Sequence, residues 1–146
     1  MMRIGFVGLG MMGKPMASCL VSSGKYRVIG YDISNENMEA VAELGVDKHS
    51  GSLRELAETT DLIILMLPNG DIVKNVVLGD DQEGLINGLK KGSTILDMSS
   101  VSPFQTQGHL ARLSFFSNHH WFQVRPSGEA RRLAEKEGIQ IKLYSI

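Results

Sequence analysis

The sequence has little of several features that mark specialised classes of protein. It contains a single cysteine, Cys19, so no disulfide can form within the chain, and this usage is typical of a reducing compartment. Its longest apolar runs, such as residues 62–67, are far shorter than the roughly 20 residues of a membrane-spanning helix. The net charge is −1, so the basic excess that is typical of nucleic-acid binding is missing. These absences favour a protein that acts neither on nucleic acid nor in a membrane.

The first residues also lack the pattern of a targeting segment. Met-Met-Arg leads directly into an apolar run, with no charged-then-apolar leader and no Arg-rich, Ser-rich stretch. We therefore expect a cytoplasmic protein.

The composition that is present fits one ordinary globular domain. The chain has 146 residues, of which 42% are hydrophobic and 21% are charged. Short apolar runs alternate with segments of helical periodicity, which predicts a doubly wound, mostly parallel α/β sheet. The predicted strands are residues 3–8, 27–31, 62–67 and 93–98, and the predicted helices are residues 12–21, 35–44, 52–58 and 71–77.

The character of the sequence changes after Pro103. Residues 104–125 hold five of the nine aromatics, three of the four histidines and no acidic residue, without a period of 2 or 3.6. We interpret this segment as an insertion of uncertain structure, such as translated non-coding sequence. Residues 126–146 then read as a remnant helix and a last strand. The three parts are thus a dinucleotide-binding domain at residues 1–103, the insertion and the remnant.

A glycine-rich turn follows the first predicted strand. Gly8, Gly10 and Gly13 match G-x-G-x-x-G between a strand and a helix, the fingerprint of the Rossmann dinucleotide-binding topology. Gly8 would permit the tight turn, Gly10 the approach of a pyrophosphate, and Gly13 close packing of helix on strand. The amide groups that begin the helix carry partial positive charge and attract phosphate. The alternative is a purely structural turn.

Asp32 ends the second predicted strand, about 20 residues beyond the last glycine of the turn. A carboxylate in that place accepts hydrogen bonds from ribose hydroxyls and repels the 2′-phosphate of NADP. No arginine occurs in residues 33–36, so the sequence predicts NAD rather than NADP as the cofactor. The alternative is a solvated loop aspartate.

Three motifs carry a resemblance to a known family. They are GLGMMGKPMA at residues 8–17, MLPNGDIVKNVVLG at 66–79 and GSTILDMSSVSP at 92–103. In this order and spacing, residues 1–103 resemble the β-hydroxyacid dehydrogenases, which include 3-hydroxyisobutyrate dehydrogenases and tartronate semialdehyde reductases. The resemblance implies the following cofactor contacts: Leu9, Gly10, Met11 and Met12 at the pyrophosphate, Leu67, Pro68 and Asn69 under the adenosine ribose, and Ser100 near the nicotinamide.

The family's catalytic lysine has no counterpart in the sequence. In the family it lies in a glycine-spaced helix beyond a substrate loop, and neither Lys136 nor Lys142 has that setting. We therefore assign no catalytic residue, and the family's helical domain for substrate binding and dimerisation is missing. The resemblance implies the NAD-binding half of an oxidoreductase that transfers hydride between a nicotinamide cofactor and a small 3-hydroxy acid. This chain would be inactive alone, and the complete enzyme would be an oligomer.

Two alternatives remain open. The chain could instead be a non-catalytic dinucleotide-binding sensor or interaction module on the same fold, because fold alone does not fix function. Its compartment could be the mitochondrial matrix, where relatives in higher cells work.

Two further features receive structural interpretations. The adjacent histidines at residues 119–120 lack partners at ligand spacing, so we expect no metal site. Cys19 falls on the apolar side of the first predicted helix, so we expect a buried, unreactive thiol.

Overall fold

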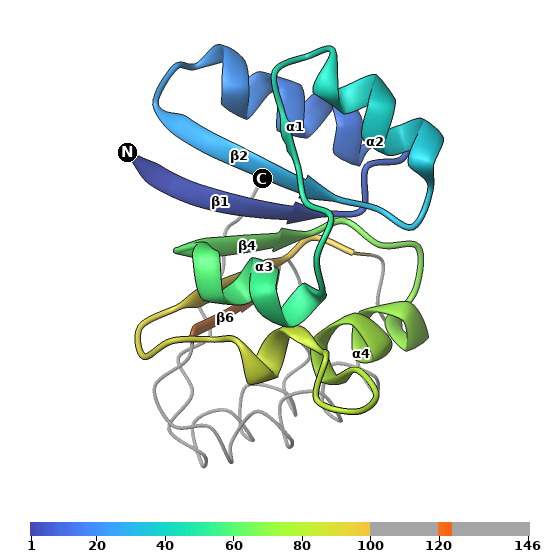
Figure 1. Cartoon of the computed structure of the whole chain (residues 1–146), viewed down its shortest axis with the longest axis vertical. Coiled ribbons are helices and arrows are strands. Elements are labelled where there is room, and N and C mark those ends of the chain that lie inside the picture. The colour runs from blue at the N-terminus through green and yellow to red at the C-terminus, as the bar shows by residue number, and fades with distance from the viewer. Residues whose placement is uncertain (100–119, 124–146) are drawn as a thin grey trace.

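The computed structural model of the chain describes residues 1–99 and 120–123. In this part of the chain, six strands form one sheet in the order β3-β2-β1-β4-β5-β6, and all five neighbouring pairs are parallel (Figure 1). The strands are β1 (Met2–Val7), β2 (Tyr26–Tyr31), β3 (Asp47–Lys48), β4 (Leu62–Leu65), β5 (Thr94–Asp97) and β6 (His120–Gln123). The predicted doubly wound parallel sheet is confirmed.

Helices cover both faces of this sheet. They are α1 (Gly13–Ser22), α2 (Asn35–Ala42), α3 (Leu53–Thr59), α4 (Gly70–Leu78) and the short 3₁₀ helix η1 (Leu85–Asn87). Helices α1 and α2 lie over one face, and α3, α4 and η1 lie over the other (Figure 1). Parallel strands buried on both faces require continuous apolar runs, which explains the sequence Leu-Ile-Ile-Leu in β4.

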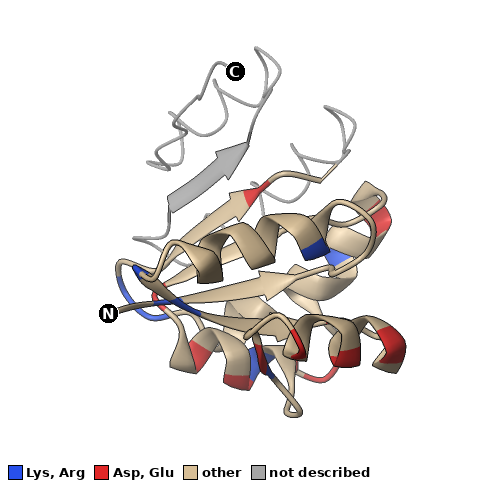
Figure 2. Ribbon diagram, turned by 90° about the horizontal axis from the view of Figure 1, so that it is seen from above, with Lys and Arg blue, Asp and Glu red and all other residues tan. Residues whose placement is uncertain are grey.

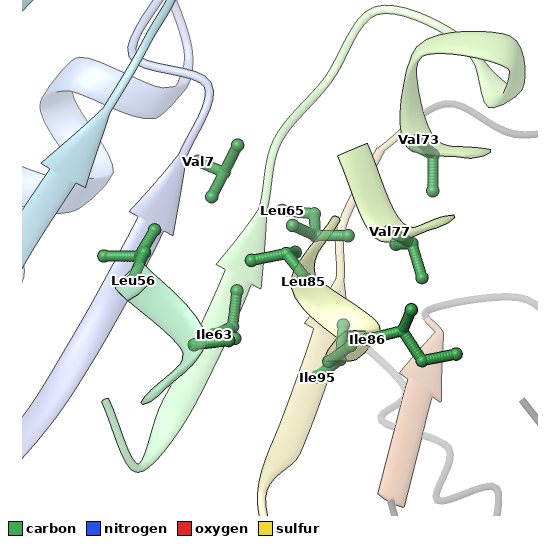
Figure 3. Close-up of a cluster of buried hydrophobic side chains, with 10 residues drawn as sticks. Val7, Leu56, Ile63, Leu65, Val73, Val77, Leu85, Ile86 and Ile95 are labelled. Atoms are coloured by element: carbon green, nitrogen blue, oxygen red, sulfur yellow. The ribbon is translucent and has the colours of Figure 1, made fainter. Parts of the chain in front are cut away.

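The hydrophobic core therefore has two halves, one on each face of the sheet. Because side chains alternate along a strand, Phe6 packs toward α1 and α2, whereas its neighbour Val7 packs toward α3 and α4. Figure 3 shows the second half, in which Leu65 and Ile95 of the sheet face Leu85 of η1. Both halves are closed to solvent, so the carboxyl ends of the strands are held on a rigid base.

The strand order creates a crevice beside β1. This strand pairs with β2 on one side and with β4 on the other, so the connections that leave β1 and β4 diverge to opposite faces of the sheet. Ligands of open α/β sheets bind in the crevice at such a switch point.

Most predicted elements are confirmed, with shifts of a few residues at their ends. The two-residue strand β3 and the short helix η1 were not predicted, because neither is long enough to show a period. The predicted buried position of Cys19 is wrong, since its side chain is exposed. The apolar face of α1 passes through Met16, Ala17 and Leu20 instead.

Only a small part of the predictions for residues 104–146 falls within the described residues. The helix and strand expected in residues 126–146 lie outside the described residues. Strand β6 falls within residues 104–125 and pairs with β5 from Thr94↔His120 to Asp97↔Gln123. That this segment is an insertion stays a prediction.

The capping box that begins α3 provides a first test of the fold. The Ser52 hydroxyl accepts a hydrogen bond from the Glu55 amide (3.2 Å), and the Glu55 carboxylate accepts one from the Ser52 amide (3.0 Å). We expect Ser52→Ala to lower the free energy of unfolding by about 1 kcal/mol, because it leaves that helix amide without its acceptor. Urea denaturation would measure this loss. The exposed neighbour Ser50, changed to alanine, is the control and should lose far less.

Candidate dinucleotide-binding site

The glycine turn joins β1 to α1 and is tied to the neighbouring strands. The Gly8 amide donates a hydrogen bond to the Tyr31 carbonyl at the end of β2 (3.0 Å). Gly8 has a φ of 94°, and a Cβ atom there would overlap the Met66 carbonyl. A Cβ atom on Gly13 would overlap the Gly8 carbonyl. The fold itself therefore demands glycine at both positions.

Gly10 differs from these two glycines. A Cβ atom added there would meet no atom within 4 Å, and its φ does not lie in the left-handed region. Nothing in the described fold requires glycine at this position. Its lack of a side chain instead keeps the surface of the turn open, which suits a ligand that approaches the backbone closely.

The start of α1 presents amide groups without a side-chain cap. Its N-cap residue, Met12, makes no capping hydrogen bond, and its first turn holds no acidic residue. By contrast, α2, α3 and α4 are capped by the side chains of Ser34, Ser52 and Asn69. Pro15 has no amide proton and the Lys14 amide donates to the Gly10 carbonyl (3.0 Å), so the amides of the turn just before them are the ones placed to donate to phosphate oxygens.

Asp32 lies directly after β2 and holds the glycine turn in place. Its Oδ2 atom accepts a hydrogen bond from the Leu9 amide (2.7 Å), and its Oδ1 atom accepts one from the Ser34 amide (2.8 Å). The carboxylate is half-buried, and each oxygen has a further lone pair. Asp32 can therefore fix the turn and still accept from a ligand hydroxyl.

These groups line one cavity of about 550 Å³, a volume typical of small-molecule sites. Eight of the predicted cofactor residues line it: Gly8, Gly10, Met11, Met12, Gly13, Asp32, Leu67 and Pro68. The side chains of Met11 and Ile33 are 94% and 95% exposed, so the cavity is open to solvent there. The turn, the acidic residue and the loop after β4 thus share one site at the carboxyl ends of the strands.

A buried carboxylate ends β5 beside this site. Asp97 is only 1% exposed, and Figure 2 shows acidic colour at the end of this otherwise uncharged strand. Burial raises the pKa of Asp97 to about 6, although hydrogen bonds from the Ser99 amide and side chain act in the opposite direction. The Ser99 hydroxyl also accepts a hydrogen bond from the Leu67 amide (2.9 Å). Asp97 is therefore connected to the loop that lines the cavity.

A family comparison agrees with this geometry. The model of the NAD-binding domain of 6-phosphogluconate dehydrogenase matches residues 3–129 of the chain. The chain belongs to this family of NAD-binding domains. It is therefore a domain for a nicotinamide dinucleotide, which the cavity beside the glycine turn suits in size and chemistry.

Similar proteins extend the likeness of this NAD-binding domain. The 3-sulfolactaldehyde reductase of Escherichia coli (strain K12) is 40% identical over 114 residues, which are 76% of this chain and 36% of that protein. The mitochondrial 3-hydroxyisobutyrate dehydrogenase of Rattus norvegicus is 35% identical over 100 residues, covering 68% of this chain and 29% of that protein. The resemblance to hydroxyacid dehydrogenases is confirmed. The chain spans about a third of the length of these relatives.

A solved structure gives the same picture. The 3-hydroxyisobutyrate dehydrogenase from Salmonella typhimurium superimposes with a TM-score of 0.71 at 25% identity, covering 92% of this chain and 45% of that one. The NAD-binding domain described above is therefore the part of the chain that these proteins share.

Two of the predicted cofactor residues that the structure describes, Leu9 and Asn69, do not line the cavity of the NAD-binding domain. Leu9 is 1% exposed and packs in the core, so only its amide faces Asp32. Asn69 caps α4, with its Oδ1 atom accepting from the Ile72 amide (3.0 Å). Ser100 lies outside the described residues.

Sequence reasoning missed several residues of this cavity. Tyr31, Asn37 and Ile72 line it, although no motif marks them. Asn37 lies in the first turn of α2 and Ile72 in the first turn of α4, so both helix starts lie at the same end of the sheet as the glycine turn. That position relative to the strands was the only signal that could have found them.

Clusters of metal ligands and membrane-spanning helices are absent from residues 1–99 and 120–123. In this part of the chain, no three His, Cys, Asp or Glu residues are grouped so that they could hold a metal ion. None of its helices is long and apolar enough to cross a membrane.

Proposed function

We propose that this chain is the cofactor-binding part of an NAD-dependent oxidoreductase that acts on a small 3-hydroxy acid. The observation that carries this proposal is that the start of α1 and Asp32 line the same cavity. The uncapped amides would bind the pyrophosphate, while the Asp32 carboxylate would accept hydrogen bonds from the adenosine ribose. The names of the relatives, which include hydroxyacid dehydrogenases, support the substrate class.

The cofactor supplies hydride chemistry when it is bound, and this chain's residues bind and orient it. Gly8, Met11, Met12 and Gly13 would surround the pyrophosphate. The residues Leu67 and Pro68 form the opposite wall of the cavity and would lie under the ribose. We expect the 146-residue chain to bind the cofactor without turning over substrate, because it spans only 36% of the length of the 3-sulfolactaldehyde reductase that it resembles and holds no counterpart of the family's catalytic lysine.

The preference for NAD over NADP follows from charge. The Asp32 carboxylate lies where the 2′-phosphate of NADP would approach, and no basic residue follows in residues 33–36. Two negative groups held close together at a partly buried site repel each other more strongly than they do in water.

The compartment stays a prediction: we expect the cytoplasm, with the mitochondrial matrix as the alternative.

A titration with both reduced cofactors tests the proposal. We expect NADH to bind at least about tenfold more tightly than NADPH, which corresponds to about 1.4 kcal/mol. The variant Asp32→Asn removes the negative charge with little change in size, so it should narrow this ratio. The exposed Asp80 is the matched control, since Asp80→Asn makes the same charge change elsewhere. Tighter binding of NADPH by the unchanged chain would contradict the NAD assignment, and no binding of either cofactor would contradict the function.

A further inference from the structure

Asp97 is a buried carboxylate that the proposed cofactor contacts do not use. It is 1% exposed and does not line the cavity. Its Oδ1 atom accepts a hydrogen bond from the Ser99 amide (3.0 Å). Its Oδ2 atom has no hydrogen-bond partner among the described residues. A buried acidic group with so little support is costly to keep ionised, so its retention needs an explanation.

The hydrogen bonds around Ser99 connect Asp97 to the cavity. The Ser99 hydroxyl accepts from the Leu67 amide (2.9 Å) and has one proton of its own to donate. The Ser99 amide donates to the Asp97 Oδ1 atom (3.0 Å), so the buried carboxylate holds the backbone of Ser99 in place. With its lone pair fixed toward the Leu67 amide, Ser99 restrains the chain where it leaves β4.

Leu67 is the point at which this chain of hydrogen bonds reaches the site. Met66, Leu67 and Pro68 line the cavity one after another, on the wall opposite Asp32. The Met66 amide is held by the Val7 carbonyl (2.9 Å), and the Leu67 amide is held by Ser99. Proline has no amide proton, so the Leu67 amide is the last backbone donor before the exposed Pro68.

We propose that Asp97 is a positioning residue for the dinucleotide cavity: it holds the Ser99 amide, and the Ser99 hydroxyl in turn holds the Leu67 amide and so fixes the loop at residues 66–68. This inference rests on the proposed function, because the loop is positioned for the cofactor. Asp97 itself touches neither the cavity nor the cofactor. Asp97 is buried and both hydrogen bonds of Ser99 are partly buried, so the geometry of the loop is set before the ligand binds.

A double-mutant cycle on NADH affinity tests this path. We expect Ser99→Ala to weaken binding about 3- to 10-fold, the range of one net hydrogen bond. Asp97→Asn should also weaken it, because a neutral amide oxygen accepts the hydrogen bond from the Ser99 amide less strongly than a carboxylate does. The double variant should bind about as well as Ser99→Ala alone, since both changes act on the same contact. Ser99→Thr keeps the hydroxyl and should bind within about twofold of the unchanged chain.

Ser93 provides a matched control at the other end of β5. Its hydroxyl also accepts a backbone hydrogen bond, from the Lys90 amide (2.9 Å), and its side chain is buried as well. Ser93→Ala should lose stability comparably to Ser99→Ala and leave NADH affinity unchanged. Amide hydrogen exchange at Leu67, measured without ligand, should accelerate in Ser99→Ala and Asp97→Asn but not in Ser93→Ala.

The outcomes separate this inference from the proposed function. Absence of NADH binding by the unchanged chain would overturn the proposed function. Unaltered NADH binding by Asp97→Asn, or additive losses in the double variant, would overturn the positioning role alone. Unaltered Leu67 exchange in Asp97→Asn would also overturn it, whatever the ligand result.

Discussion

The variant Gly8→Ala is expected to lose roughly 3 kcal/mol or more of folding free energy. Alanine at a φ of 94° is strained, which costs of order 1–3 kcal/mol, and overlap with buried backbone adds a similar amount. The overlap is with the Met66 carbonyl, which cannot withdraw because the Met66 amide is bonded to Val7 in β1. Since whole domains are stable by only about 5–15 kcal/mol, urea denaturation should show a large drop in the unfolding midpoint.

Gly10→Ala is the matched control for this prediction, because it adds the same methyl group two residues along the same turn. Its Cβ atom meets nothing within 4 Å, so the free energy of unfolding should stay within about 0.5 kcal/mol of that of the unchanged chain. Its NADH affinity should nevertheless fall at least about tenfold, since the methyl group stands where the pyrophosphate would approach. Normal stability in Gly8→Ala would show that the turn can relax, and normal NADH binding in Gly10→Ala would show that no ligand approaches it.

The variant Asp97→Asn is expected to stabilise the fold at neutral pH, by about 1–3 kcal/mol. Burial raises the pKa of Asp97 from 3.8 to about 6, and at 1.36 kcal/mol per unit this difference corresponds to about 3 kcal/mol. The folded state binds this proton more tightly than the unfolded state does. The stabilisation that protonated Asp97 contributes to the folded state is therefore fully present below about pH 3.8 and is lost as the pH rises through about 6. Asparagine removes the anion, although it weakens the hydrogen bonds with Ser99.

Denaturation at pH 4.5, 6 and 7.5 would measure this effect. The advantage of Asp97→Asn over the unchanged chain should grow with pH through this range. Comparing the two chains removes the background from other acids, including Asp61, whose pKa is lowered by the hydrogen bond from the Arg3 amide and which acts with the opposite sign. An advantage that does not change with pH would mean that Asp97 does not titrate as described. If Asp97→Asn is more stable yet binds the cofactor less well, then the unchanged chain keeps Asp97 for cofactor binding at the cost of some folding stability.

Much of the fold could be predicted because local patterns and packing agree. The run Leu-Ile-Ile-Leu predicted a strand buried on both faces, and both hydrogen bonds of the Ser52–Glu55 capping box are present. Where the local signal was weak, prediction failed. The two residues of β3 are both exposed and carry no apolar alternation. Cys19 lies within an apolar stretch of sequence, but its angular position on α1 turns it to solvent.

The candidate site could be predicted in part, for a related reason. The glycine spacing and Asp32 stand on consecutive elements, so their proximity follows from parallel strands, and Asp32 does bond to the Leu9 amide. The hydrogen bond from the Leu67 amide to the Ser99 hydroxyl joins residues 32 positions apart, so no local pattern predicts it. Sequence alone gives Ser99 the appearance of a turn residue and places Asp97 in a strand without showing that it is buried, because burial of the carboxylate depends on strands packed around it.

The place of β1 in the sheet has a consequence for the growing polypeptide. Strand β1 is an interior strand, and its partner β2 follows within residues 26–31, whereas its other partner β4 is complete only at residue 65. The amides and carbonyls along one edge of β1 therefore stay unpaired while some thirty further residues are translated. The same delay postpones the cavity, since its wall at Met66 does not exist until the ribosome has passed that codon.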